Sequence, residues 1–147
     1  MSSRRPNNPP KSRIGRKRGV VGVIRRDGKF LIIRRSRHVT APLKLCLPGG
    51  TMEAGESEEQ TLVREMKEEL SIDVSPVRLC WRSITPWGTT LAWWQADLDP
   101  DVTPVPDPSE VAEYHWMSEE DIYFAKDMLP SLPAFIDAIA SGEVQLD

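Results

Sequence analysis

Cysteine and histidine are scarce in this chain, and this limits the metal sites it can build. Cys46 and Cys80 are its cysteines, and His38 and His115 its histidines. With so few of both, the sequence predicts no zinc cluster of the His/Cys type. Two thiols far apart, without a secretion signal, are expected to be reduced core residues and not a disulfide. A bound metal ion would therefore be held mainly by oxygen, which favours Mg²⁺ or Mn²⁺.

Long apolar runs are also missing. No stretch approaches the roughly 20 apolar residues that a membrane-spanning helix needs. The basic N-terminal residues are not followed by the apolar segment of a secretory signal. We therefore expect a soluble, cytoplasmic protein without a membrane partner, and the 147 residues suit one domain.

Negative charge is absent from the N-terminal segment. Residues 1–18 hold seven basic residues and no acid, which leaves 12 basic against 22 acidic residues and a net charge of −10 in the remainder. This segment is rich in Pro, Ser and Asn and has no apolar periodicity, so we predict a disordered basic tail over 1–18 and a single domain over 19–147. A nucleic-acid-binding arm is the alternative for the tail.

The clearest element is a helix that begins after Ser57. Ser57 and Gln60 have the spacing of a capping box, and two glutamates follow Ser57 in the first turn, where the helix dipole favours negative charge. Leu62, Met66 and Leu70 recur at i, i+4 and i+8, which predicts one stripe facing a core. The helix is expected to end at Ser71.

Shorter patterns surround this helix. A turn signal at Asp27-Gly28 predicts a hairpin, and Leu47-Pro48-Gly49-Gly50 reads as a turn. Strands and helices are interleaved, so the fold class is α/β or α+β. The expected elements are a hairpin over 20–35, strands over 77–85, 90–98 and 113–117, and helices over 119–128 and 130–140.

The long helix carries a second, acidic face. Glu65, Glu68 and Glu69 lie at i, i+3 and i+4, so their carboxylates project together, and Glu56 adds a fourth acid before the helix. Like charges at this spacing repel each other, and the apolar stripe anchors the helix against rotation. Converging carboxylates on an anchored helix are the ligands that hard divalent cations require, although a solvated acidic face has the same composition.

The residues around this face resemble the signature of the Nudix hydrolases. The chain reads Gly50, five residues, Glu56, seven residues, then Arg64-Glu65-Met66-Lys67-Glu68-Glu69-Leu70-Ser71-Ile72. It departs from the family only at Ser71, where the family has glycine. A non-glycine residue in the left-handed conformation at a helix end costs roughly 1 kcal/mol but removes no ligand.

The resemblance implies a fold and a set of site residues. Over 19–147 it implies an α/β/α sandwich around a mixed β-sheet. It also implies Mg²⁺ (or Mn²⁺) bound by Glu68 and Glu69, with Glu65 as a further ligand or the base. The remaining implied residues are the backbone carbonyl of Gly49 or Gly50 as an extra ligand, and Arg64 paired with Glu56 to fix the loop against the helix.

The resemblance further implies hydrolysis of a pyrophosphate bond in a nucleoside diphosphate linked to another group. ADP-ribose, nucleoside triphosphates, nucleotide sugars and dinucleoside polyphosphates are the candidate substrates. Because the base in this family can lie in a distant loop, Glu110 is the candidate catalytic base and Glu113 the second choice. The alternatives are a binding or regulatory domain without catalysis, and an RNA 5′-end pyrophosphohydrolase. Because family members are often homodimers, a homodimer is a further expectation.

Substrate contacts are expected outside the signature. Arg34, Arg35 and Arg37 follow an apolar strand, where basic side chains could reach phosphates. Trp87 lies in a predicted turn and could stack on a base. The remaining tryptophans are expected mostly in the core.

Overall fold

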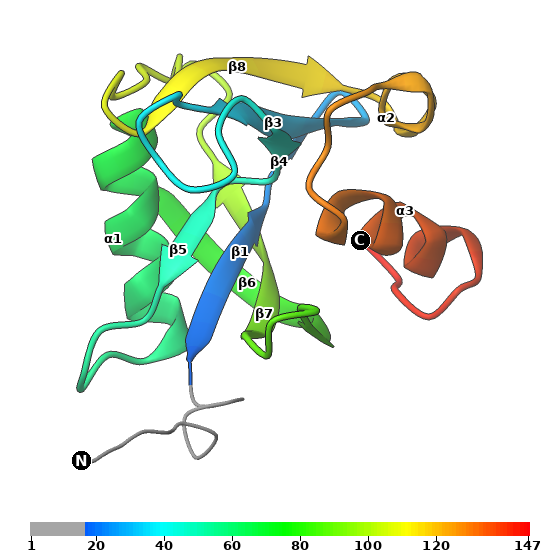
Figure 1. Cartoon of the computed structure of the whole chain (residues 1–147), viewed down its shortest axis with the longest axis horizontal. Helices are drawn as coiled ribbons and strands as arrows, with labels where there is room; N and C mark the ends of the chain where they lie inside the picture. The colour runs from blue at the N-terminus through cyan, green and yellow to red at the C-terminus, as the bar shows by residue number, and fades with distance from the viewer. Residues whose placement is uncertain (1–16) are drawn as a thin grey trace.

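The fold was obtained as a computed structural model that describes residues 17–147, and it contains two four-stranded sheets (Figure 1). The first sheet has the order β5-β1-β7-β6. Strands β1 and β7 are parallel, whereas the β1–β5 and β6–β7 pairs are antiparallel, so this sheet is mixed as predicted. Its strands are β1 (Arg18–Val23), β5 (Gly49–Thr51), β6 (Val74–Ile84) and β7 (Thr90–Leu98).

The second sheet is antiparallel and is centred on β3. Strand β3 pairs with β2 and β4 and, separately, with β8. The predicted Asp27-Gly28 turn is present, but it joins β2 to β3. The hairpin expected over 20–35 was therefore wrong for its first arm, because β1 pairs with β5 and β7 of the other sheet. The strands are β2 (Arg25–Arg26), β3 (Lys29–Arg35), β4 (Leu45–Cys46) and β8 (Val111–Met117).

Two of the helices begin where their capping residues predict. Helix α1 (Glu58–Leu70) has the complete capping box of Ser57 and Gln60, and it ends at Ser71 with φ 55° and ψ 38°, the left-handed conformation that the signature glycine would adopt. Helix α2 (Glu119–Phe124) begins at a second capping box. It is shorter than expected, and α3 (Ser131–Ala140) follows.

Two apolar cores lie on opposite faces of the sheets, which gives the α/β/α layering that the family resemblance implied. Val20 packs in the core that α1 covers, and its neighbour Val21 packs in the core that α3 covers. Leu31 and Ile32 of β3 divide in the same way. This alternation follows from the two-residue period of a strand. Figure 1 shows α1 on one side of the strands and α3 on the other.

Several segment boundaries differ from the predictions, including the starts of β6 and β8, which lie at Val74 and Val111 and not at 77 and 113. The turn expected at 47–50 is instead the entry to β5, whose Gly49 and Gly50 pair with β1. The tail predicted over 1–18 lies outside the described residues except for its last two, and Arg18 already belongs to β1. Among residues 17–147, no helix combines the length and apolar character that crossing a bilayer demands.

Candidate metal centre and cleft

Three carboxylates converge at the C-terminal half of α1. Glu65 and Glu69 are one turn apart and both are buried. Glu110 precedes β8, and one carboxylate oxygen from each of the three lies within 4.8 Å of the others. The backbone fixes the Glu110 segment, because the Ser36 N–H donates to the Glu110 carbonyl at 3.0 Å.

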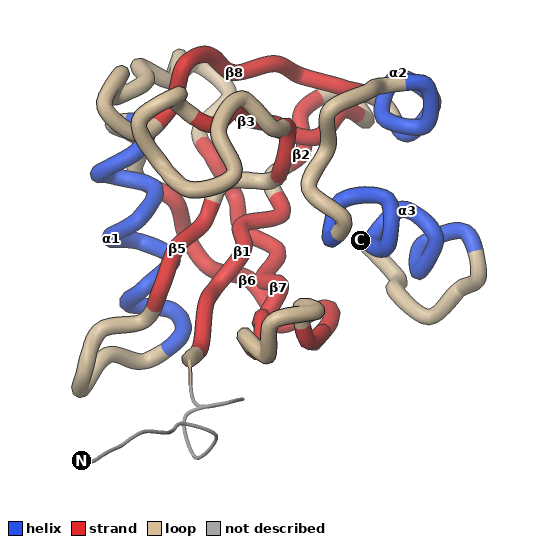
Figure 2. Tube along the Cα trace, viewed as in Figure 1, coloured by secondary structure: helices blue, strands red, loops and turns tan. Residues whose placement is uncertain are grey.

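The loop that contains Glu110 and the loop between β3 and β4 meet at one end of the molecule. The loop after β7 is held against the helix end, because the N–H of Asp107 donates to the Glu69 carbonyl at 2.9 Å. Figure 2 shows this loop and the β3–β4 loop as tan segments near one another beside α1. A residue 41 positions beyond Glu69 is thereby brought to the helix face.

Gly50 allows the Glu65 carboxylate to approach the sheet, and Gly49 allows β5 to pack closely against β1. A Cβ atom on Gly50 would lie 2.2 Å from Cδ of Glu65, and one on Gly49 would lie 2.1 Å from the Val20 carbonyl oxygen. Neither position can accept a side chain without displacing the strand or the carboxylate. The N–H of Gly49 also donates to Oε1 of Glu69 at 3.2 Å, which orients that group.

Burial disfavours the ionised forms of Glu65 and Glu69. Burial, reinforced by the charge of Glu65, raises the pKa of Glu69 to about 9, against the opposing hydrogen bond from Gly49. Burial also raises the pKa of Glu65, against the opposing Arg64. An all-oxygen donor set whose negative charges are this costly fits a hard divalent cation, which would compensate them directly.

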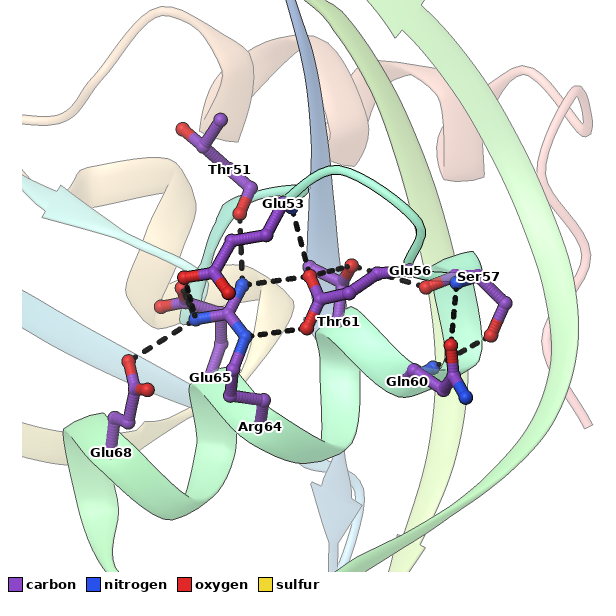
Figure 3. Close-up of polar contacts among 9 residues, drawn as sticks. All are labelled: Thr51, Glu53, Glu56, Ser57, Gln60, Thr61, Arg64, Glu65 and Glu68. Carbon is purple, nitrogen blue, oxygen red and sulfur yellow. Dashed lines mark hydrogen bonds and ion pairs between the residues drawn. The ribbon is translucent and has the colours of Figure 1, made fainter.

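Arg64 ties the helix to the preceding loop (Figure 3). Its Nε and Nη2 donate to the two oxygens of Glu56 at 2.6 and 3.0 Å, a bidentate ion pair. Its Nη1 donates to Glu65 at 2.8 Å, and Nη2 also reaches the Thr51 carbonyl at 3.0 Å. The guanidinium therefore connects the loop, the edge strand β5 and a carboxylate of the cluster.

Glu56 is held on its other side by groups of its own loop and of α1. The Glu53 N–H donates to it at 2.9 Å, and the hydroxyl of the fully buried Thr61 donates at 2.8 Å. The hydrogen bond from Arg64, then that from Glu53, lower the pKa of Glu56 to about 2. The sequence did not lead us to expect Thr61 in the site. Its position on the face of α1 nearest Glu56 was the feature that could have identified it.

Glu68 lies outside the cluster. Its side chain is 51 % exposed and accepts from Nη1 of Arg64 at 3.2 Å. Since residues at i and i+3 are about 60° apart around a helix, Glu68 is carried to the solvent edge while Glu65 and Glu69 stay inward.

A cleft of about 450 Å³ adjoins this centre. Gly49 and Gly50 form part of its wall, and Arg35 and Trp87 also line it. Arg35 is held by the carbonyl of Thr40 at 2.9 Å, and Trp87 is 64 % exposed. The lining is predominantly apolar, and includes contributions that sequence reasoning missed: Val21, Leu47, Ile84, Leu91, Trp93, Leu129 and Ala134.

The other two predicted substrate arginines do not line the cleft: Arg37 is exposed outside it, and Arg34 points elsewhere. Arg34 donates to Glu113 at 3.2 Å and to the Leu43 carbonyl at 3.0 Å, and it lines a separate open hollow beside α2. Glu113 also contacts His115 at 2.6 Å. Successive strand residues face opposite sides, so Arg34 and Arg35 cannot both face the cleft. The carboxylate cluster contains Glu110 and not Glu113.

Comparison with known proteins agrees with this geometry. A sequence model described as the NUDIX domain matches residues 14–138. The chain belongs to the Nudix hydrolase family. The domain match covers most of the chain, including both sheets, α1, α2 and most of α3.

Nudix relatives match over parts of their length. An NAD-capped RNA hydrolase NudC of Vibrio atlanticus is 32 % identical over 113 residues, 76 % of this chain and 39 % of that protein. A Nudix hydrolase of Deinococcus radiodurans is 31 % identical over 108 residues, 65 % of this chain and 59 % of that protein. The chain thus spans about two fifths to three fifths of these relatives.

Solved structures show the same fold. The MutT protein from Methanosarcina mazei superposes with a TM-score of 0.74 at 24 % identity, over 88 % of this chain and 96 % of that one. A NUDIX hydrolase from Nitrosomonas europaea gives 0.64 at 26 % identity, over 87 % and 90 %.

Proposed function

We propose that this Nudix chain is a Mg²⁺-dependent pyrophosphohydrolase acting on a nucleoside diphosphate linked to another group. The observation that carries the proposal is the convergence of Glu65, Glu69 and Glu110 within 4.8 Å beside an apolar cleft. Two of the three acids are buried, and Gly50 leaves room for one of them, an arrangement that a solvated acidic surface does not need and whose charge a bound cation would compensate. Mn²⁺ is expected to substitute, because it prefers the same oxygen ligands.

Glu65 and Glu69 would hold the cation, together with a backbone carbonyl of Gly49 or Gly50. Glu68 would be a further ligand, because releasing its exposed ion pair with Arg64 costs little. When bound, a divalent cation lowers the pKa of water and stabilises charge on the departing phosphate. Arg64 keeps Glu65 oriented, and Gly49 does the same for Glu69.

Glu110 is the proposed general base. It reaches the cluster from a separate loop and is exposed, so it can exchange its proton with solvent after each turnover. Glu113 is not retained in this role, because Arg34 and His115 occupy its carboxylate away from the cluster. Glu65 would remain the alternative base if Glu110 proved dispensable.

The cleft would hold the nucleoside part of the substrate. Its apolar lining suits a base and ribose, Arg35 supplies a cation for phosphate, and Trp87 offers an exposed ring for stacking. The relatives' names mention NAD-capped RNA and, for a Methanocaldococcus jannaschii protein 46 % identical over 55 residues, ADP-ribose. Both compounds contain the pyrophosphate linkage that we propose to be cleaved.

The test is product release from ADP-ribose, NAD, dinucleoside polyphosphates, nucleotide sugars and nucleoside triphosphates. We expect cleavage of one class with Mg²⁺ or Mn²⁺, none with EDTA, and loss of activity in Glu69→Gln and Glu110→Gln. The matched control is Glu113→Gln, which should retain activity. A folded protein that binds these compounds and cleaves none of them, with either metal, would indicate a binding domain without catalysis.

A further inference from the structure

The loop between β7 and β8 is attached to the C-terminal end of α1 by backbone hydrogen bonds. The N–H of Val105 donates to the Leu70 carbonyl at 2.8 Å, and the N–H of Asp107 donates to the Glu69 carbonyl at 2.9 Å. Carbonyl groups in the last turn of a helix have no partner within the helix, so this loop satisfies two of them. The loop is therefore held by the same turn of α1 that carries the Glu69 carboxylate.

Asp107 begins the turn that leads to Glu110. Its carbonyl accepts from the N–H of Glu110 at 3.0 Å and from the N–H of Val111 at 2.8 Å. The first of these is the i to i+3 hydrogen bond of a β-turn over 107–110, whose order Asp-Pro-Ser-Glu places aspartate and proline where such turns favour them. Since the N–H of Asp107 is bonded to α1 and its carbonyl to Glu110, this residue links the proposed base to a proposed metal ligand.

The side chain of Asp107 closes this turn from the inside. Its Oδ1 accepts from the N–H of Ser109 at 3.0 Å and from the Ser109 hydroxyl at 2.9 Å. An aspartate bonded in this way to the residue two positions later stabilises the turn that contains both. Because Glu110 is exposed, packing does little to hold it, and its direction depends on the backbone of the turn.

We propose that Asp107 is a positioning residue for hydrolysis, whose carboxylate, through Ser109, fixes the turn over 107–110 and so holds Glu110 against Glu65 and Glu69. Asp107 acts through Glu110 and not by contact with the reacting atoms. A general base contributes roughly 10²–10⁴-fold to a rate, and a displacement of about 1 Å can remove 100-fold. The proposal rests on the pyrophosphohydrolase function with Glu110 as its base.

Three single variants test this role through kcat, KM and the Mg²⁺ concentration for half-maximal activity. Asp107→Ala removes the acceptor, whereas Asp107→Asn removes the charge and keeps Oδ1. The matched control is Asp99→Ala, because Oδ1 of Asp99 accepts from the N–H of Asp101 at 2.9 Å at the other end of the same loop. Asp107→Ala should lower kcat about tenfold and leave the other two quantities within about twofold. Asp107→Asn and Asp99→Ala should keep kcat within about twofold of the native value.

A double variant shows whether Asp107 acts through Glu110. If it does, Asp107→Ala combined with Glu110→Gln should have the kcat of Glu110→Gln alone, whereas independent effects would multiply to a further loss of about tenfold. Amide hydrogen exchange in the metal-free protein reports the turn directly. Exchange at Ser109, Glu110 and Val111 should become faster in Asp107→Ala and stay unchanged in Asp107→Asn.

The results that would overturn the proposal differ from those that would overturn the function. An unchanged kcat in Asp107→Ala, an equal loss in Asp107→Asn, or a further loss in the double variant would each refute the positioning role. Full activity of Glu110→Gln would remove both the base assignment and the positioning role. In all of these cases the native protein still hydrolyses its substrate. Failure of the native protein to cleave any of the compounds, with Mg²⁺ or Mn²⁺, would overturn the pyrophosphohydrolase function and the positioning role together.

Discussion

Glu69→Gln should stabilise the metal-free protein at alkaline pH while removing its activity. The folded environment raises the pKa of Glu69 from 4.5 to about 9. Between these values the unfolded chain is ionised at this residue and the folded chain is protonated, so the folded state binds one more proton. The free energy of unfolding must then fall as pH rises, by about 1.4 kcal/mol per pH unit.

The magnitude follows from a two-unit change in pH. From pH 6 to pH 8 the native protein should lose about 3 kcal/mol through Glu69, and the Gln variant should lose none of this. The variant's stability relative to the native protein should thus increase by about 3 kcal/mol over that interval. Because only the change with pH is compared, a constant packing effect of the amide cancels.

Urea unfolding in EDTA, followed by tryptophan fluorescence at pH 6 and pH 8, measures this difference. Glu68→Gln is the matched control, since its exposed side chain should change stability by less than about 0.5 kcal/mol at either pH. Saturating Mg²⁺ should stabilise the native protein, by about 3 kcal/mol at 100 times Kd, and leave Glu69→Gln nearly unaffected. Parallel pH profiles for the native and Glu69→Gln proteins would refute the reasoning.

Substitutions at three further positions test the surroundings of the site. Arg64→Lys removes the bidentate pair with Glu56 and should lower kcat/KM by about 10–100-fold with the fold retained; a change below twofold would show that the pair is dispensable. Thr61→Val removes the hydroxyl that donates to Glu56 and should raise the Mg²⁺ concentration for half-maximal activity about tenfold, whereas Thr61→Ser keeps the hydroxyl and should not. An equal rise of this concentration in both variants would indicate that Thr61 acts through packing alone. Ser71→Gly relieves the left-handed φ of 55° and should raise the unfolding free energy by about 0.5–1 kcal/mol in urea titrations without altering turnover; an unchanged midpoint would contradict this.

Local features of the sequence were sufficient to predict α1 and half of its site. Ser57 and Gln60 satisfy the helix's own first turn, so the start of α1 needs no distant contact. The four-residue spacing of Glu65 and Glu69 places them on one face of any helix. The left-handed conformation at Ser71 likewise follows from where the apolar stripe stops. These are effects between residues within one or two turns of each other.

The sheet partners and the third carboxylate were decided by tertiary structure. The Asp27-Gly28 turn could be predicted from the sequence, but the sheet that β1 joins could not. The partners of β1 lie about 30 and 70 residues away, and a local pattern carries no information about such pairing. Glu110 could be named from the family's late acidic position. Its approach to Glu69, however, depends on backbone hydrogen bonds between two loops and the end of α1.

The sequence by itself determined the helix, its caps, the alternation of buried residues and the identity of the acids, because each depends on neighbours along the chain. The tertiary structure decided which acids are buried together. It placed Glu68 at the solvent edge and turned Arg34 away from the cleft. It also made Lys17, the residue before β1, part of the cleft wall. Burial and the distance between charges are properties of the packed molecule, and they set the pKa of Glu69 and the chemistry that the site can perform.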